Sequence, residues 1–258
     1  MTFRTTNIKP SGRVASTPGD SIRGWYPTLL NNLIGYWELE EASGTRNDSH
    51  GANHLTDTNT VTQGVGVVGN AALYTRANSE TLVSASNAAL QTGDIDLTLA
   101  CWVKFNTKPG SMGMMCKDNN GGEPNNREYQ LQYANSSGKF VFQVSGNGTA
   151  TAGRFADTFG TPPLDTWMFV VGWHNSVLNT INIQVNNGGV DTTAHTTGIF
   201  VGTNDFRLGS LGTTNYLDGL LDQCGLWKRV LTPVERAWLY NAGAGRSYSQ
   251  VQEYRDAA

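Results

Sequence analysis

FRLGSLGTTNYLDGLLDQCGLWKRVLTPVERAWLYNAG, residues 206–243, decides the fold, because a strand pattern changes to a helix pattern within it. From Leu220 to Leu226 every second residue reads Leu, Asp, Cys, Leu, so on a period of two Asp222 shares a face with three apolar side chains. A buried carboxylate is costly unless a cation, several N–H donors or protonation compensates it. The stretch therefore predicts a buried strand that carries one unusual acid.

The helix pattern that follows has clear ends. Thr232 can cap the first amides, Pro233 occupies the first helical position, and Glu235 stands three residues after the cap, which completes a capping box. Residues 241–243 end the helix with a Gly that tolerates a left-handed backbone. One apolar face is enough to pack this short helix over the end of a sheet. That expected face consists of Val234, Ala237 and Trp238.

The composition favours a single all-β domain. Charged residues make up 15% of the 258 residues, while Gly alone contributes 30. Short strands joined by tight turns use Gly, Asn and Thr, whereas long surface helices need more Lys and Glu. The net charge of −3 argues against general nucleic-acid binding, since neutralising phosphates needs a basic surface.

Residues 1–30 read as an extended arm, because they contain three prolines and show neither strand nor helix periodicity. The arm has four basic residues and one acidic residue, which gives +3 and leaves −6 for the rest of the chain. We expect it to dock on other protein subunits of an assembly, with a solvated tail as the alternative. The residues expected to make this contact are Arg4, Lys9, Arg13, Arg23, Trp25 and Tyr26.

Several short strands follow, separated by turn residues, as in an antiparallel β-sandwich. In residues 97–105 the odd-numbered residues from Leu97 to Phe105 face one way, which predicts a half-buried strand. The three cysteines have no metal-ligand spacing and are expected to be buried thiols. Further strands are expected at 33–39, 81–83, 112–117, 128–133, 140–145, 167–174 and 181–186, with a glycine-rich segment at 64–74.

The order of these segments resembles the laminin-G-like, concanavalin A-like jelly-roll domains of phage and bacterial surface proteins. The likeness covers residues 31–245 and leaves 246–258 as a C-terminal tail. It implies an antiparallel jelly-roll β-sandwich with one short C-terminal helix. The segments that carry it are YWELEEASGTRNDSHGANHL, GVVGNAALYT, LTLACWVKF, LDTWMFVVGWH, INIQVNNG, FRLGSL and LDGLLDQCGLWKRVLTPVERAWLYNAG.

Members of this family often hold a structural calcium ion, and the matching positions here are Asp48 and Asp222. Ca²⁺ is a hard cation that takes several oxygens, and it would neutralise the buried charge of Asp222. Glu38 or Glu40 would assist. The alternative is that backbone amides and a cation such as Arg46 hold Asp222.

Glycan binding needs aromatic faces and planar polar groups. The loop DNNGGEPNNR, residues 118–127, supplies such groups, and tyrosines lie on the strand that follows; a solvated loop is the alternative. Trp37, Trp102, Trp167 and Trp173 are expected in the core or on sheet faces. The candidate glycan-binding residues are Asn125, Asn126, Arg127, Tyr129 and Tyr133.

No catalytic residue is assigned. Glu38 and Glu40 share a face, as do the paired acids of jelly-roll glycosidases, but residue 42 is Ala, so a third acid at the next alternate position is missing. Surface charges explain them better. The four histidines are scattered and lack a metal-binding spacing.

The sequence thus predicts a non-enzymatic binding subunit displayed on a larger assembly, specifically a phage virion decoration or tail-associated protein with a glycan-binding or adhesion role. A stand-alone lectin and a glycoside hydrolase are the alternatives. No signal peptide follows Met1 and no apolar run spans a bilayer, so we expect synthesis in the cytoplasm, display on a particle surface and no membrane insertion, with an extracellular location as the alternative.

Overall fold

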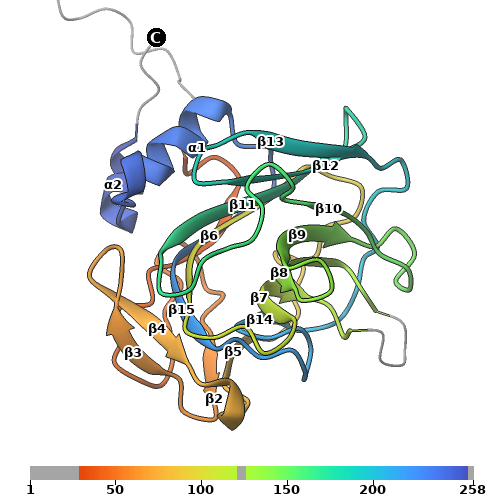
Figure 1. Cartoon of the computed structure of the whole chain (residues 1–258). Coiled ribbons are helices and arrows are strands. Elements are labelled where there is room, and N and C mark those ends of the chain that lie inside the picture. Colours follow the sequence, from red (N-terminus) through yellow and green to blue (C-terminus); the bar gives the residue numbers. More distant parts are fainter. Residues whose placement is uncertain (1–28, 121–125, 255–258) are drawn as a thin grey trace, which may run out of the picture.

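Two antiparallel sheets packed face to face make up the body of the computed structural model, which describes residues 29–120 and 126–254 (Figure 1). The predicted antiparallel jelly-roll β-sandwich is confirmed. One sheet has eight strands in the order β13-β12-β11-β6-β15-β4-β3, with β1 paired to β15. The other has seven strands in the order β10-β9-β8-β7-β14-β5-β2.

The eight-stranded sheet consists of β1 (Leu33–Trp37), β3 (Thr62–Val65), β4 (Asn70–Tyr74), β6 (Leu97–Phe105), β11 (Met168–Asn175), β12 (Thr180–Val185), β13 (Val190–Ala194) and β15 (Gly219–Trp227). The seven-stranded sheet consists of β2 (Thr56–Thr58), β5 (Thr81–Ser84), β7 (Met112–Lys117), β8 (Tyr129–Ala134), β9 (Lys139–Val144), β10 (Ala152–Phe155) and β14 (Phe206–Leu208). The helices are η1 (Arg76–Asn78), α1 (Pro233–Tyr240), η2 (Asn241–Gly243) and α2 (Tyr248–Glu253).

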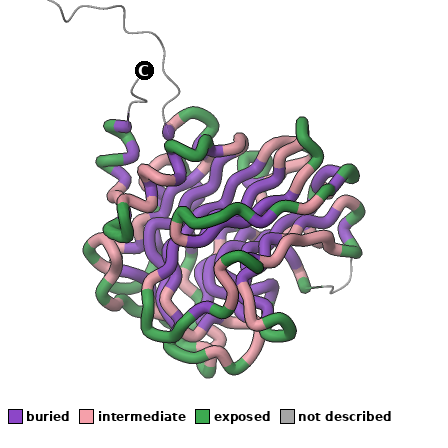
Figure 2. Tube along the Cα trace, turned by 45° about the horizontal axis from the view of Figure 1, so that its top comes forward, coloured by how far each residue is buried: buried purple, intermediate pink, exposed green. Residues whose placement is uncertain are grey.

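The main core lies between the inner faces of the two sheets, and the strands there are buried along most of their length (Figure 2). In β6 the face from Leu97 to Phe105 points into this core, as the alternation predicts. The opposite face is also buried, because Ala100 and Trp102 pack into a second apolar cluster outside the sheet. The prediction of a half-buried strand was therefore wrong, because Leu239, Tyr248 and Val251 of the C-terminal helices belong to the apolar cluster that covers the outer face of this sheet.

The strand β15 departs from strict alternation at a β-bulge. Its pairing with β6 shifts between Asp222 and Gly225, and Gln223 has a φ of 46°. An inserted residue reverses the direction of the side chains that follow it. Cys224 and Leu226 therefore face the core between the sheets, while Asp222 does not. The predicted face shared by Asp222 and Cys224 was wrong because a period of two ignores the bulge.

The helix α1 has the predicted start, but only part of the predicted buried face, since Trp238 packs partly buried against the outer apolar cluster. The Thr232 Oγ1 atom accepts from the Glu235 amide, and the Glu235 carboxylate accepts from the Thr232 amide, so the capping box is present. Val234, however, is 59% exposed. The buried helix residues are Glu235, Arg236 and Leu239. Charged side chains can be buried here because each has partners: Arg236 stacks on a tryptophan ring and Glu235 binds Arg229.

The C-terminal segment continues the domain beyond the predicted tail boundary. A second helix, α2, was not predicted, and its Tyr248 and Val251 are buried in the outer apolar cluster. At the other end, Leu29 is fully buried and its carbonyl accepts from the Trp227 indole. The arm residues predicted to contact a partner, Arg4, Lys9, Arg13, Arg23, Trp25 and Tyr26, lie outside the described residues.

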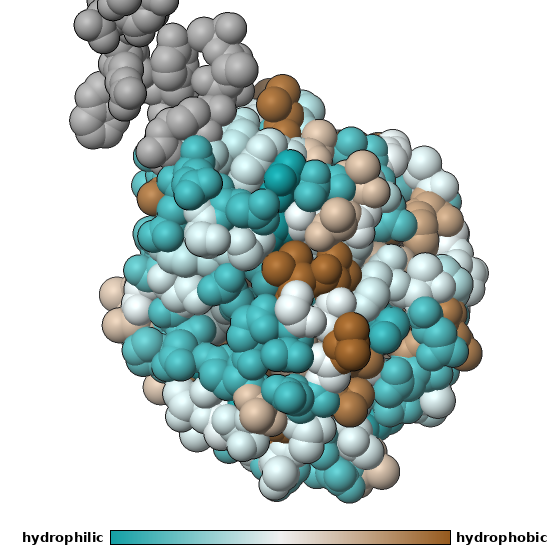
Figure 3. All heavy atoms as spheres, turned by 90° about the vertical axis from the view of Figure 1, so that its left-hand side faces the viewer, coloured by the Kyte–Doolittle hydropathy of each residue, from teal (hydrophilic) through white to brown (hydrophobic). Residues whose placement is uncertain are grey.

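The strands that sequence periodicity missed are short and lie at or near sheet edges, namely β2, β3, β10 and β13. They carry mostly partly or fully exposed side chains, so they show no apolar alternation. The surface on the left-hand side of Figure 1, where β3 and β4 lie, is largely hydrophilic with small apolar patches (Figure 3). Val65 of β3, 78% exposed, is one of the exposed apolar side chains.

Candidate functional site

A groove lies on the outer face of the seven-stranded sheet. Its larger part, about 480 Å³, is lined from β2, β5 and β14 and from the loop that follows β14. A smaller pocket of about 120 Å³ adjoins it, and Asp205, Arg207 and Thr213 line both. The remaining lining residues are Thr56, Thr58, Thr81, Val83, Ala85 and Tyr216 in the larger part and Asp118, Asn119, Asn204 and Gly212 in the smaller.

Cross-strand register explains how these residues meet. Thr56 of β2 pairs with Val83 of β5, and Val83 pairs with Arg207 of β14. Arg207 pairs in turn with Cys116 of β7. Paired residues point to the same face of a sheet, so Thr56, Val83 and Arg207, from three distant parts of the sequence, form one row on the outer face, next to the fully buried Cys116. Asp118 follows the end of β7, directly beside this row.

Asp118 is the most unusual group in the groove. Its side chain is buried, with 2% of the residue exposed, and its Oδ2 atom has no hydrogen-bond partner. The Oδ1 atom accepts from the Asn120 amide at 2.5 Å. Burial raises the pKa of Asp118 to about 6, while the Asn120 amide and the charge of Arg127 oppose the rise. An acceptor buried without a donor is costly, so this oxygen is suited to a donor from a bound molecule.

The other charges of the groove are already paired. The Arg207 guanidinium lies 3.4 Å from an Asp205 carboxylate oxygen. The second Asp205 oxygen accepts from the Ser86 amide. Tyr216 adds an aromatic side chain to the lining, and its carbonyl is held by Arg76 at 2.8 Å. The groove thus combines one aromatic ring, several threonine hydroxyls, amides and one unpartnered carboxylate oxygen.

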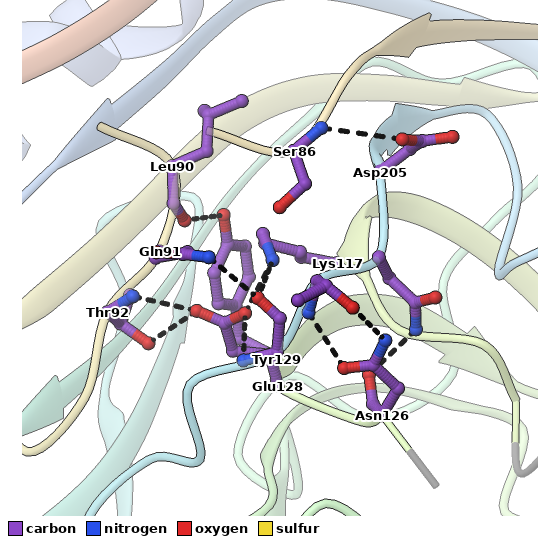
Figure 4. Close-up of polar contacts among 12 residues, drawn as sticks. Ser86, Leu90, Gln91, Thr92, Lys117, Asn126, Glu128, Tyr129 and Asp205 are labelled. Carbon is purple, nitrogen blue, oxygen red and sulfur yellow. Dashed lines mark hydrogen bonds and ion pairs between the residues drawn. The ribbon is translucent and has the colours of Figure 1, made fainter. Parts of the chain in front are cut away.

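A buried ion pair adjoins segments that line the smaller pocket (Figure 4). Lys117 Nζ lies 2.7 Å from Glu128 Oε2, and neither side chain is exposed to solvent. The Glu128 carboxylate also accepts from the Thr92 amide, the Thr92 hydroxyl and the Gly202 amide, and Lys117 donates to the Gly202 carbonyl. These bonds join the end of β7 and the residue before β8 to two loops, and the second loop continues directly into Asn204 of the pocket lining. The pair therefore acts as a scaffold with its hydrogen-bonding capacity used internally.

The predicted glycan-binding residues are divided by the structure. Asn126 and Arg127 lie beside the smaller pocket, since the Asn126 carbonyl accepts from the Asn204 side chain and Arg127 acts electrostatically on Asp118. Asn125 lies outside the described residues. The expectation that Tyr129 and Tyr133 bind a glycan was wrong, because both side chains belong to the core between the sheets, with exposures of 0% and 4%. They alternate inward on β8, so neither ring is available as a sugar platform.

Sequence reasoning selected the loop after β7 but missed the rest of the groove. Arg207, Asp205 and Tyr216 come from the segment around β14, about 90 residues further along the chain. The alternation of Phe206 and Leu208 inward places Arg207 outward, and this was the signal that could have indicated it. The predicted burial of the tryptophans is confirmed for Trp37, Trp102 and Trp173, and Trp167 packs partly buried against the outer cluster.

The predicted calcium ligand Asp48 has a complete set of backbone donors. Its Oδ1 atom accepts from the amides of Tyr36 and His50, and its Oδ2 atom accepts from the amide of Asn53, each at 3.0 Å. These bonds tie the loop after β1 back onto the strand. The oxygens of Asp48 are thus used to shape the loop.

Asp222 is only half satisfied. Its Oδ2 atom accepts from the amides of Val67 and Val68 at 2.7 and 3.0 Å, while its buried Oδ1 atom has no partner. Backbone amides therefore hold this carboxylate, as the alternative interpretation expected, but Arg46 instead donates to backbone carbonyls. Within residues 29–120 and 126–254 no three His, Cys, Asp or Glu side chains are placed to hold a metal. Calcium stays a prediction, and Asp222 Oδ1 is the oxygen that fits it.

Glu38 and Glu40 serve the fold of the segments around them. Glu38 accepts from the Tyr248 amide and the Ser49 hydroxyl, and Glu40 accepts from the Asn70 amide. Neither lines the groove. The predicted thiol state is confirmed, because Cys101, Cys116 and Cys224 are buried and free.

Another hollow, of about 500 Å³, lies beside β10 and β13. It is lined by small and polar residues together with His195, whose ring lies 5.6 Å from that of His174. His195 bonds the Gly198 carbonyl, and burial lowers the pKa of His174. Among its described lining residues this hollow has no Phe, Tyr or Trp ring and no carboxylate, so the groove on the seven-stranded sheet is the better candidate site.

A family model described as the concanavalin A-like lectin/glucanases superfamily, of laminin G type, matches residues 75–235, more than half of the chain. The chain belongs to this superfamily. The match extends from the start of η1 to the first turn of α1, so it includes every lining residue of the groove except Thr56 and Thr58. The comparison with curated protein sequences gives no match.

Solved structures with the same superfamily fold come from binding domains and carbohydrate-active proteins. The binding domain of Paraclostridial Mosquitocidal Protein 1 matches with a TM-score of 0.62 and 14% identity over 83% of this chain and 53% of that one. Domain 4 of a GH43 extracellular arabinanase from Geobacillus stearothermophilus, solved with arabinotriose, matches with a TM-score of 0.60 and 15% identity over 83% of this chain and 98% of that one. Trypanosoma rangeli sialidase in complex with sialic acid matches with a TM-score of 0.61 and 12% identity over 86% of this chain and 35% of that one.

At identities of 12–15%, the likeness to these solved structures establishes only the fold of this chain. The chain spans about half of the toxin chain and about a third of the sialidase chain, whereas it spans nearly the whole arabinanase domain. Among the helices of the described ranges, none has the length and apolar character needed to cross a bilayer.

Proposed function

We propose that this protein is a carbohydrate-binding module that holds a glycan in the groove on its seven-stranded sheet. The observation that carries the proposal is Asp118: a buried carboxylate oxygen without a donor, at the base of a groove that also offers Arg207, Tyr216 and threonine hydroxyls. Sugars present dense hydroxyl donors and one apolar ring face, which suit this combination. The superfamily of the chain and the arabinotriose complex of a structural neighbour support it.

The experiment is a glycan-array screen of the full chain, followed by calorimetric titration of each hit. Tyr216→Ala removes the aromatic side chain of the groove and is expected to weaken binding about tenfold, since stacking and apolar contact of one ring contribute on the order of 1 kcal/mol. Leu164→Ala, at a 44% exposed position that does not line the groove, is the matched control and should bind unchanged. Array hits with equal affinity in Tyr216→Ala would remove the groove from the proposal.

A glycoside hydrolase is the second candidate, and one observation favours testing it. Two carboxylates, Asp118 and Asp205, line the smaller pocket, and two-carboxylate hydrolysis needs one acid with a raised pKa. Glu38 and Glu40, the acids suggested by sequence, do not line the groove. New reducing ends released from a bound oligosaccharide, and abolished in Asp118→Asn, would replace the binding module by an enzyme; intact ligand after long incubation supports the module.

We also propose that the module is displayed on a larger assembly, as a phage virion decoration or tail-associated protein with an adhesion role. The charge division, +3 for residues 1–30 against −6 for the remainder, supports an arm that docks on an acidic partner subunit. Deleting residues 1–28 should abolish incorporation into particles while leaving glycan affinity unchanged. Incorporation of the truncated chain at the normal level would refute the role of the arm.

A further inference from the structure

We infer that the groove selects an uncharged oligosaccharide and rejects acidic ones, with one sugar hydroxyl donating to Asp118 Oδ2. This inference rests on the proposed carbohydrate-binding function and names the ligand class. The charges that face the groove set this selectivity, because electrostatic complementarity decides specificity more than it decides raw affinity.

The groove is lined by two carboxylates and one guanidinium, and Arg127 beside the smaller pocket adds a positive charge that acts on Asp118. Among the lining residues of the described chain these are Asp118, Asp205 and Arg207. The guanidinium is engaged by Asp205 at 3.4 Å, so a sugar carboxylate or sulfate that binds Arg207 has to displace that partner. It would also lie close to the carboxylate of Asp118, and two like charges repel each other strongly in a partly desolvated pocket.

The hydroxyls of an uncharged sugar are not repelled by these carboxylates and can donate to them. Asp118 Oδ2 is an acceptor that lacks a donor, and each hydroxyl carries one. Three exposed threonines and two asparagines in the lining supply further groups able to donate or accept, while the buried Thr81 hydroxyl is already bonded to the Leu208 carbonyl. Hydrogen bonds to an ionised acceptor are shorter and about twice as strong as neutral ones, so the carboxylate should be the strongest single contact.

The shape indicates which part of a glycan enters. The larger, open part of the groove, about 480 Å³, continues into the smaller pocket of about 120 Å³ at one end. An oligosaccharide lying along the groove places one sugar edge over the smaller pocket and its other units against the threonine-rich floor. A single small polar molecule would leave most of the groove empty.

Calorimetric titration of the full chain with matched trisaccharides tests the inference. Arabinotriose and cellotriose are the neutral probes, and sialyllactose and trigalacturonic acid are the acidic probes. We expect at least one neutral probe to bind and both acidic probes to bind at least tenfold more weakly. Asp118→Asn should weaken the neutral probe about tenfold or more, because an interaction with a charged acceptor is lost. Asp157→Asn, which removes an exposed carboxylate after β10, is the control and should bind unchanged.

The pH profile is a second readout that a purely structural role of Asp118 would not give. Neutral-probe affinity should be full above pH 7 and should fall as the pH drops through about 6, where the carboxylate takes up its proton. The affinity of Asp118→Asn should stay flat over the same range. Thr213→Val, at an exposed lining position, keeps the test open if Asp118→Asn fails to fold, and it should weaken the neutral probe as well.

Different results would overturn the proposed ligand class and the proposed carbohydrate-binding function. Tighter binding of an acidic probe, and a gain in that binding in Asp118→Asn, would overturn the class while leaving a carbohydrate-binding module. Binding that disappears with a chelator and returns with Ca²⁺ would also overturn the direct contact to Asp118. If no probe and no glycan on the array binds, the proposed function itself fails.

Discussion

Replacing Asp222 with Asn should stabilise the protein at alkaline pH, which is an unusual expectation for a buried, hydrogen-bonded residue. The carboxylate is fully buried, only its Oδ2 atom has donors, and burial is the main reason that its pKa rises from 3.8 to about 7. The Glu40 charge adds to the rise, and the backbone amides of Val68, Val67 and Gln223 oppose it. The folded protein therefore favours the protonated side chain.

The sign and size of the effect follow from proton linkage. Because the folded pKa lies above the unfolded one, the stabilisation from the protonated side chain is complete below about pH 4 and is lost as the pH rises through 7. The rise from 3.8 to about 7 is roughly 3 pH units at about 1.4 kcal/mol each, so ionisation costs on the order of 4 kcal/mol at pH 8. Asn has the same shape and no charge, and its oxygen can accept from both amides.

The assay is urea unfolding of Asp222→Asn and of the unsubstituted chain at pH 4.5 and pH 8. We expect similar free energies of unfolding at pH 4.5 and an advantage of about 2–4 kcal/mol for the variant at pH 8. Asp157→Asn is the control, because pairing with Lys139 lowers the pKa of Asp157 and its contribution is instead lost as the pH falls. A variant that is less stable at pH 8 would refute the reasoning.

Calcium at Asp222 gives the opposite result, so the same pair of proteins tests that prediction. A bound cation keeps the carboxylate ionised and stabilises the folded state by mass action. The unsubstituted chain would then gain melting temperature with Ca²⁺ and lose it with a chelator, and Asp222→Asn would respond to neither. Equal melting temperatures with Ca²⁺ and with chelator would remove calcium from this site.

Other substitutions test the scaffold in thermal and urea unfolding. Glu128→Gln leaves Lys117 buried without its counter-charge and should cost about 3–5 kcal/mol, whereas Asp157→Asn, which breaks exposed pairs, should cost less than about 1 kcal/mol; equal losses would show that burial does not set the value of the pair. Thr232→Ala removes the helix cap and should cost about 1 kcal/mol, so an unchanged midpoint would contradict the assigned cap. Gly209→Ala should cost about 2–4 kcal/mol, because φ is 84° there and a Cβ would approach a buried tyrosine ring to 2.3 Å; a neutral result would show that the loop after β14 can shift.

Local sequence patterns determined the fold class, most central strands and the start of α1. The bounds expected for β6 and β7 agree with the structure, because these strands show long apolar stretches bounded by turn residues. The capping box was readable because every group involved lies within four residues. Edge strands escaped notice because a neighbour's hydrogen bonds, rather than their own side chains, make them strands.

Tertiary structure alone decided which of the flagged residues form a site. Tyr129 and Tyr133 are suitable for sugar binding by type, but their parity on β8 turns both rings into the core. Asp222 was noticed from sequence, yet one bulge at Gln223 decides which side of the sheet it faces. The groove unites Thr56, Asp118 and Arg207, and only pairing of strands distant in sequence brings them together. Residue chemistry is local and can be read along the chain, whereas register and parity are set by long-range hydrogen bonding.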